Sequence, residues 1–166
     1  MIIMNAEKPT FITGYTTRTY LLLDLDGTTL HNVLGLVREI MDSWRNVGDA
    51  LIMYSSKCTG DGVASWHPNS NRFSRHGRLN FHVVFSNSIG YDRCVKIILT
   101  LFEFGVLNED YIDIRKFRGD MTLRVSTKVL QERTILKPKP VAYVQNCRST
   151  VFGRGITAYQ TLYNYA

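Results

Sequence analysis

Hydrophobic residues recur at two different spacings along this chain, and the two spacings predict different elements. Short runs rich in Val, Ile, Leu, Phe and Tyr are typical of β-strands. We expect strands over 19–26, 50–54, 80–85, 111–115, 122–126 and 141–145. Elsewhere apolar residues follow the spacing i, i+3, i+4 and i+7, which places them on one face of a helix. This spacing predicts helices over 33–46, capped by Asn32, and over 94–102, ending at Gly105.

The order of these elements between residues 19 and 115 is strand, helix, strand, strand, helix, strand. That order is the split βαβ, ferredoxin-like plan, an α+β fold in which both helices cover one face of an antiparallel sheet. In this plan the first and third strands lie side by side at the centre, and the fourth pairs with the first. A length of 166 residues fits a single domain with a core of ordinary size.

Composition and charge narrow the class of protein. The chain is 45% hydrophobic and 20% charged, as in a soluble globular protein, and its net charge of +6 favours polyanionic partners such as nucleic acid or nucleotides. Its cysteines, Cys58, Cys94 and Cys147, form no C-x-x-C pair, so we expect reduced thiols. No apolar run approaches the roughly 18–20 residues of a membrane span, and no signal-peptide pattern is visible. We therefore expect a cytoplasmic protein that does not bind a membrane.

Two aspartates end the first predicted strand, within the sequence YLLLDLDGTTL of residues 20–30. Because side chains alternate along a strand, Asp24 and Asp26 should face the same side. Two carboxylates that close repel each other unless a cation or a shared proton neutralises them, which suggests a divalent-metal site or an acid/base pair. The ordinary alternative is a strand that runs into an Asp26-Gly27 turn, which does not need the first aspartate.

Two further polar residues fall on other strands of the same predicted sheet. His82 lies on the third strand and Asp113 on the fourth, so both can converge with the aspartate pair on the face away from the helices. Mg²⁺ typically takes one or two carboxylates plus substrate phosphates, and a nearby histidine can hold a phosphate or assist proton transfer. Taken singly, His82 has the ordinary explanation of a structural histidine, and Asp113 that of a solvent-facing strand residue.

Together these residues resemble the motifs of the archaeo-eukaryotic primase superfamily, the primase-polymerases, whose catalytic unit is RRM-like. That family has D-x-D on its first strand, a small residue-x-His on its third and an apolar residue-Asp on its last. The matching segments here are LLLDLD, LNFHVVF and YIDIR. The resemblance covers roughly residues 19–128, and it implies an RRM-like βαββαβ core there, with residues 129–166 as a C-terminal extension of extra strands within the single domain 1–166.

The resemblance implies metal-dependent nucleotidyl transfer by a minimal DNA or RNA primase-polymerase, with a role in DNA replication and a partner replication subunit. Asp24, Asp26 and Asp113 would be catalytic and bind Mg²⁺ or Mn²⁺, and His82 would contact the phosphates of the incoming nucleotide. Asp120 competes with Asp113 for the third acidic role. Charge and position add candidate nucleotide- or phosphate-binding residues. These are Ser55, Ser56, Lys57, Asn80, Arg124 and Lys128.

The segment from 57 to 78 shows no hydrophobic period and is rich in Gly, Ser, Asn and basic residues. Its interleaved rings and cations resemble a surface that binds single-stranded nucleic acid, where bases stack on aromatic side chains and cations follow the phosphates. The residues expected to bind are Arg72, Phe73, Arg75 and Arg78. A non-catalytic single-stranded nucleic-acid-binding protein of the same fold is therefore an alternative function. The ordinary alternative is a loop whose aromatics, such as Trp66, pack into the core.

A second resemblance competes with the first. LLLDLDGTTL also matches the hydrophobic-D-x-D-G-T opening of haloacid dehalogenase-like phosphatases, in which the first aspartate is the nucleophile and the second the general acid. That fold is a doubly wound parallel sheet, which needs a crossover helix between successive strands. The segment between the second and third predicted strands shows no helical period. The direction of strand pairing therefore distinguishes the two resemblances.

Overall fold

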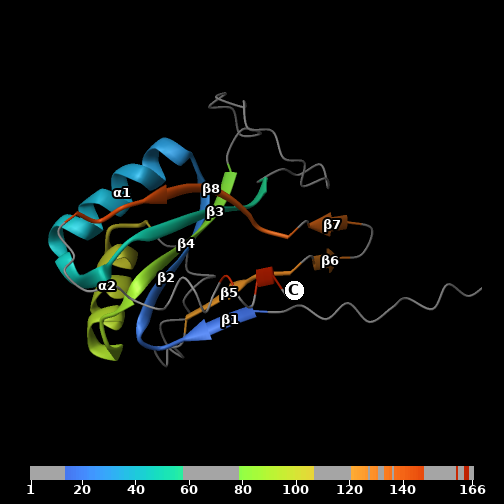
Figure 1. The fold of residues 1–166 in the computed structure, drawn as a ribbon. Helices are drawn as coiled ribbons and strands as arrows, with labels where there is room; N and C mark the ends of the chain where they lie inside the picture. The colour runs from blue at the N-terminus through green and yellow to red at the C-terminus, as the bar shows by residue number, and fades with distance from the viewer. Residues whose placement is uncertain are drawn as a thin grey trace, which may run out of the picture.

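In the part of the chain that the structure describes, the main sheet has four antiparallel strands. The structure, a computed structural model, describes residues 14–57, 79–106, 121–126, 128–130, 133–135, 137–147, 160 and 163–164, without the side chains of 56, 57, 128–130 and 133–135. The strands of the main sheet, in their order across it, are β2 (Tyr20–Thr28), β4 (Leu79–Ser88), β3 (Ala50–Lys57) and β8 (Lys139–Val144). Figure 1 shows this sheet running across the molecule.

Four shorter strands form two separate antiparallel pairs. One pair joins β1 (Gly14–Thr17) to β5 (Met121–Arg124), and the other joins β6 (Lys128–Leu130) to β7 (Arg133–Ile135). β5 also contacts β2 (Figure 1).

Both helices lie on one side of the main sheet (Figure 1). α1 (Leu30–Ser43) is followed by the short 3-10 helix η1 (Arg45–Val47), and α2 (Tyr91–Glu103) follows β4. The residues that the helices bury recur at the predicted helical spacing. They are Val33, Val37, Ile40 and Met41 on α1, and Cys94, Ile97, Ile98 and Leu101 on α2. Among the described residues, no helix is both long and apolar enough to cross a membrane.

Side chains are buried on both faces of the main sheet. Leu23, Ile52 and Val83 are opposite one another on the face toward the helices and have no exposed surface. On the other face Met53 and Val84 are also fully buried. β5 packs on that face, where its Met121 and Leu123 join the core. The face away from the helices, on which we expected the site, is therefore partly covered.

The structure confirms the α+β class and is compatible with a ferredoxin-like fold. The first and third predicted strands, now β2 and β4, are neighbours, and both predicted helices form. The fourth strand of the expected βαββαβ order, 111–115, lies outside the described residues. All strand pairs that the structure describes are antiparallel, as the ferredoxin-like plan requires and a parallel phosphatase sheet does not.

Two local expectations were wrong. Helix α1 is capped by Thr29, not Asn32, because the Thr29 hydroxyl accepts a hydrogen bond of 3.2 Å from the Asn32 backbone N–H. The last expected strand, 141–145, begins earlier, at Lys139, and includes Pro140. Proline is tolerated there because β8 is at the edge of the sheet that the described residues form.

Asp49 ties the end of β8 to the start of β3. Its Oδ1 accepts a hydrogen bond of 2.7 Å from the Asn146 backbone N–H, and its Oδ2 accepts one from the Tyr143 hydroxyl. Its own backbone N–H donates to Ser86 Oγ at 2.8 Å. Burial and then the bonded Asp49 carboxylate raise the pKa of Tyr143 to about 12, so this phenol stays protonated at physiological pH. Asp49 therefore holds together three strands of the main sheet.

Replacing this carboxylate should loosen the edge of the sheet. We expect Asp49→Ala to lower the free energy of unfolding by about 1–3 kcal/mol, because two donors lose a charged acceptor. Urea unfolding followed by circular dichroism measures the change. Glu39→Ala, on the exposed side of α1, is the matched control and should cost less than about 0.5 kcal/mol. Equal losses in the two variants would contradict this role for Asp49.

Candidate functional site

Asp24 and His82 are brought together by the central strand pair. In the antiparallel register of β2 and β4 they are direct cross-strand partners, so their side chains project from the same face. Asp24 Oδ1 and His82 Nε2 are 3.6 Å apart. The Asp24 side chain is 32% exposed and that of His82 only 4%. Asp24 is therefore accessible to a ligand, whereas His82 is buried next to it.

Arg124 reaches the same place from β5. One of its terminal nitrogens donates to the backbone oxygen of Ser55 at 3.3 Å, and the other donates to the backbone oxygen of Ser126. The imidazole of His82 also forms a hydrogen bond with the backbone of Arg124. Because Nδ1 of His82 is buried without a hydrogen-bond partner, Nε2 makes this contact. The bonds fix both the guanidinium and the backbone of Arg124 beside the pair.

The charges of these groups follow from their surroundings. The pKa of Asp24 is raised to about 7, chiefly by burial and then by the negative charge of Asp26, while Arg124 opposes the rise. The pKa of His82 is lowered to about 3, chiefly by burial and then by the charge of Arg124, while the hydrogen bond to the Arg124 backbone opposes the fall. At neutral pH His82 is therefore an uncharged imidazole, and its contact with Asp24 is not an ion pair. We call Asp24, Asp26, His82 and Arg124 the polar cluster.

Asn80 shapes the end of β2. Its Oδ1 accepts a hydrogen bond of 2.9 Å from the backbone N–H of Gly27. The register of β2 against β4 shifts between Leu25 and Thr28, and Gly27 has a φ of 64°, which favours glycine. Asn80 and Gly27 thus set the chain direction just after Asp26, whose side chain is exposed. Asp26 and Gly27 therefore lie within β2, at an irregularity in its pairing with β4, and not in a turn that follows the strand.

Asp24 and Asp26 suit one divalent cation that completes its coordination with substrate oxygens and water. After burial, the charge of Asp26 is the largest cause of the raised pKa of Asp24, so the two carboxylates repel and a cation would relieve the repulsion. Within the described ranges no group of three or more His, Cys, Asp or Glu side chains could hold a metal. Mg²⁺ sites often use only one or two carboxylates plus substrate phosphates. The residues present therefore fit such an ion.

Several predicted site residues lie outside what the structure describes. The third acidic candidates, Asp113 and Asp120, and the whole segment 58–78 are among them. So are all four residues expected to bind nucleic acid, Arg72, Phe73, Arg75 and Arg78, and the side chains of Ser56, Lys57 and Lys128. Of the expected phosphate-binding residues, Arg124 lies at the polar cluster, and Ser55 contributes its backbone oxygen.

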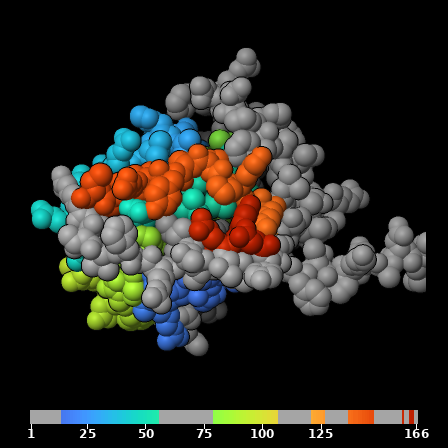
Figure 2. All heavy atoms as spheres, viewed as in Figure 1, coloured from blue at the N-terminus to red at the C-terminus, as the bar shows by residue number. Residues whose placement is uncertain are grey.

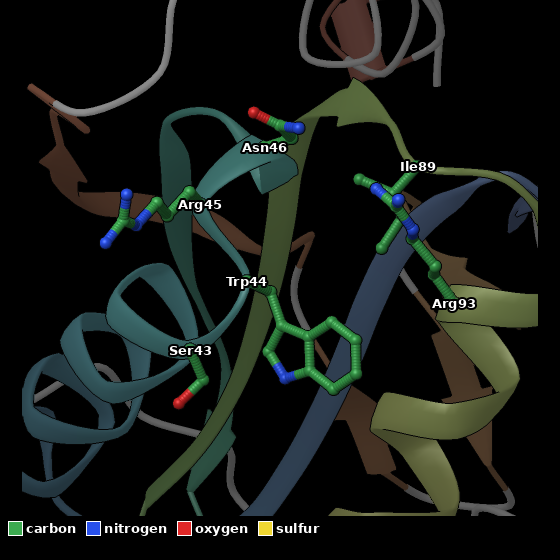
Figure 3. A pocket seen from close by; sticks show the side chains of 6 residues that line it. All are labelled: Ser43, Trp44, Arg45, Asn46, Ile89 and Arg93. Atoms are coloured by element: carbon green, nitrogen blue, oxygen red, sulfur yellow. The ribbon is translucent and has the colours of Figure 1, made fainter.

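Two hollows contain residues that the sequence did not single out. The first, of about 310 Å³, lies between strands β3 and β8 and the C-terminal residues. Its lining consists of Leu51, Met53, Pro140, Gln160, Tyr163 and Asn164. The second, of about 270 Å³, lies at the end of α1. Its lining consists of Ser43, Trp44, Arg45, Asn46, Ile89 and Arg93, drawn in Figure 3. In the sequence, the hollow at the end of α1 was indicated only by Trp44 and Arg45, which follow one another at the end of an apolar stripe.

The polar cluster offers two carboxylates, an uncharged imidazole and a guanidinium on one sheet face. An arginine fork matches the oxygens of a phosphate, and carboxylates bind the divalent ions that accompany phosphates. The cluster can therefore bind a phosphate ester together with a cation. Comparison of the chain with protein-family models, curated proteins and solved structures gave no match.

Proposed function

We propose that the protein catalyses metal-dependent nucleotidyl transfer on nucleic acid, in the manner that its resemblance to the primase-polymerases implies. The observation that carries the proposal is the pairing of Asp24 with His82 on neighbouring central strands, with Arg124 fixed beside them. These residues come from three distant parts of the sequence, and each was expected at a nucleotide site from its type and position.

Asp24 and Asp26 would hold Mg²⁺ or Mn²⁺, with Asp113 or Asp120 as the proposed third acidic residue. When bound, the ion neutralises charge on the phosphates and activates the attacking hydroxyl. Arg124 binds the phosphates from the other side, and the carbonyls of Ser55 and Ser126 keep its guanidinium in place. A guanidinium fixed in advance loses less entropy when a phosphate binds.

His82 is assigned a positioning role. Its side chain is 4% exposed and uncharged at neutral pH, and it contacts Asp24 on one side and the Arg124 backbone on the other. Because the ring is buried, a bound phosphate would contact Asp24, Asp26 and Arg124 and not His82. The imidazole thus sets the spacing between the proposed metal ligand and the proposed phosphate ligand.

The same proposal includes an RRM-like βαββαβ core. β2, α1, β3, β4 and α2 supply five of its six elements in the expected order, and residues 111–115 would be the sixth, beside β2. The antiparallel pairing of every described strand speaks against the haloacid dehalogenase-like alternative, whose sheet is parallel.

Extension of a labelled primer tests this function. The full chain, with a primed template and nucleoside triphosphates, should add nucleotides in Mg²⁺ or Mn²⁺ and none in excess chelator. Absence of incorporation with either metal, from protein shown to be folded by circular dichroism, would contradict the catalytic proposal.

A second candidate function is binding of single-stranded nucleic acid without synthesis, and the hollow at the end of α1 favours it. Figure 3 shows Trp44 projecting between α1 and α2, with Arg93 on one side and Arg45 on the other. Lys96 Nζ lies 5.6 Å from the centre of the Trp44 ring. Within the part of the chain that the structure describes, Arg45, Arg93 and Lys96 form no ion pair with a carboxylate. An aromatic ring with cations nearby is the combination that binds a base and its phosphates.

Substitutions in this hollow should weaken binding of an oligonucleotide. We expect Trp44→Ala to lower the affinity about 5- to 100-fold through loss of base stacking. Arg93→Ala should reduce the slope of log affinity against log salt by about 1. Fluorescence anisotropy of a labelled single strand at several salt concentrations measures both effects.

The matched control is Phe104→Ala, because Phe104 is 79% exposed and does not line the hollow. It should bind like the wild type. If Phe104→Ala weakens binding as much as Trp44→Ala, the loss does not depend on where the aromatic side chain lies. The hollow is then not the binding surface.

A further inference from the structure

The hollow between β3, β8 and the C-terminal residues lies on the sheet face that carries the polar cluster. We propose that it holds the base of the nucleotide whose phosphates bind at the polar cluster. Figure 2 shows atoms of β3 (teal) visible between β8 (orange) and the residues near the C-terminus (red). This inference rests on the proposed function, because it names the second half of the same substrate site.

A row of cross-strand partners connects the two places, with a register shift of β3 against β8 between Ile52 and Met53. Asp24 is opposite His82, His82 is opposite Met53, and Met53 is opposite Pro140. Direct partners project from the same face, so Met53 lies on the side of the sheet where Asp24 and His82 meet. Leu51 lies two residues before Met53 on β3 and shares that face.

The length of this row suits one nucleotide. Neighbouring strands are about 4.8 Å apart, so Met53 lies about 10 Å and Pro140 about 14 Å from Asp24 across the sheet. A nucleoside triphosphate spans such a distance between its outer phosphates and its base. The polar cluster and the hollow can therefore bind the two ends of the same molecule.

The lining of the hollow has the chemistry of a base-binding site. Leu51 and Met53 line the hollow on the side of the sheet, so its floor is apolar. Tyr163 provides an aromatic ring of the kind on which bases stack. Lys137 Nζ lies over one face of this ring, 3.9 Å from its centre.

Two amide side chains complete the lining. Gln160 and Asn164 are exposed and line the same hollow. Each amide carries both a donor and an acceptor, which is what the edge of a base requires. Apolar walls with a few polar groups are typical of small-molecule sites.

A third hollow, of about 320 Å³, adjoins Asp26 and is the rival position for the base. Its lining consists of Leu25, Asp26, Gly27, Thr28, Asn32, Val33, Leu36, Gly105 and Val106. None of these residues has an aromatic ring. Among the described residues, this hollow therefore has no aromatic stacking partner, and Val106, which is 37% exposed, supplies a matched control position.

The test compares ATP with inorganic triphosphate by isothermal titration of the full chain in Mg²⁺. Wild type should bind ATP at least about 10-fold more tightly than triphosphate, because only ATP has a base to stack. Tyr163→Ala should lower ATP affinity about 5- to 100-fold and leave triphosphate affinity unchanged. Tyr163→Phe keeps the ring and should bind ATP like wild type. Gln160→Ala/Asn164→Ala changes only exposed side chains and should also weaken ATP selectively.

Each other outcome overturns the inference in a recognisable way. If wild type binds triphosphate but binds ATP no more tightly, the base site is absent while the phosphate site stands. If Val106→Ala, and not Tyr163→Ala, weakens ATP selectively, the base lies in the rival hollow. If neither ligand binds wild type, the proposed function fails together with the base site.

Discussion

Asp24→Asn/Asp26→Asn is expected to reduce primer extension at least about 100-fold, while the variant still folds and binds oligonucleotide. The two carboxylates are the proposed ligands of the metal, and asparagine keeps their size but removes their charge. Bound metal contributes several kcal/mol to such reactions, and each 1.36 kcal/mol changes the rate tenfold. Rates of incorporation into a labelled primer in Mg²⁺ and in Mn²⁺ measure the loss.

The matched control changes the same amount of charge elsewhere. Glu39→Gln/Glu103→Gln removes two exposed carboxylates on α1 and α2. It should extend primers within about 2-fold of wild type, because exposed charges outside a site contribute little. Both double variants make the protein more basic and should bind nucleic acid at least as well as wild type. Wild-type extension by the aspartate variant, or an equal loss in the control, would contradict the role of the pair.

Asp24→Asn should also stabilise the fold, and only at higher pH. In the folded chain the pKa of Asp24 is about 7, against an ordinary value near 3.8. A raised pKa means that stability from the protonated carboxyl is fully present below pH 4 and is lost as the pH rises to 7. Asparagine never ionises and avoids that loss. We expect a gain of about 1–2 kcal/mol at pH 8, reduced because solvent reaches part of the side chain, and almost none at pH 4.

Urea unfolding of wild type and Asp24→Asn at pH 4, 6 and 8 measures this effect. The buffer must contain a chelator, because a bound cation would favour the charged carboxylate. Glu39→Gln, at an exposed helical position, should show no such pH dependence. A gain that is the same at pH 4 and pH 8, or a loss at pH 8, would show that burial does not oppose the charge of Asp24.

The local part of the site could be predicted from the sequence. Strand periodicity placed Asp24 and Asp26 on one side, and the ferredoxin-like order put the strand of His82 next to theirs. The register that puts Asp24 directly opposite His82 is a finding of the structure, because both faces of the sheet are buried and the hydrophobic pattern does not select one register. The helices were predicted from the sequence, since their buried residues follow one spacing.

The long-range part could not be predicted in this way. Arg124 was a candidate from its charge and position, but no local pattern indicates that β5 folds over the face away from the helices and carries it to the polar cluster. The base-binding hollow joins Met53 to Pro140 and Tyr163, which are about 90 to 110 positions away in the sequence. Such contacts depend on how distant segments pack, and single-sequence periodicity carries no information about that.

Binding of Mn²⁺ in the presence of a nucleoside triphosphate tests the central claim most directly, that Asp24 and Asp26 hold a cation together with a nucleotide's phosphates. Electron paramagnetic resonance of Mn²⁺ mixed with a slowly hydrolysed ATP analogue gives the affinity in wild type and in Asp24→Asn/Asp26→Asn. We predict that the analogue tightens Mn²⁺ binding to wild type and that the variant loses at least about 10-fold in affinity. Equal Mn²⁺ affinity in the two proteins, with and without the analogue, would contradict the claim.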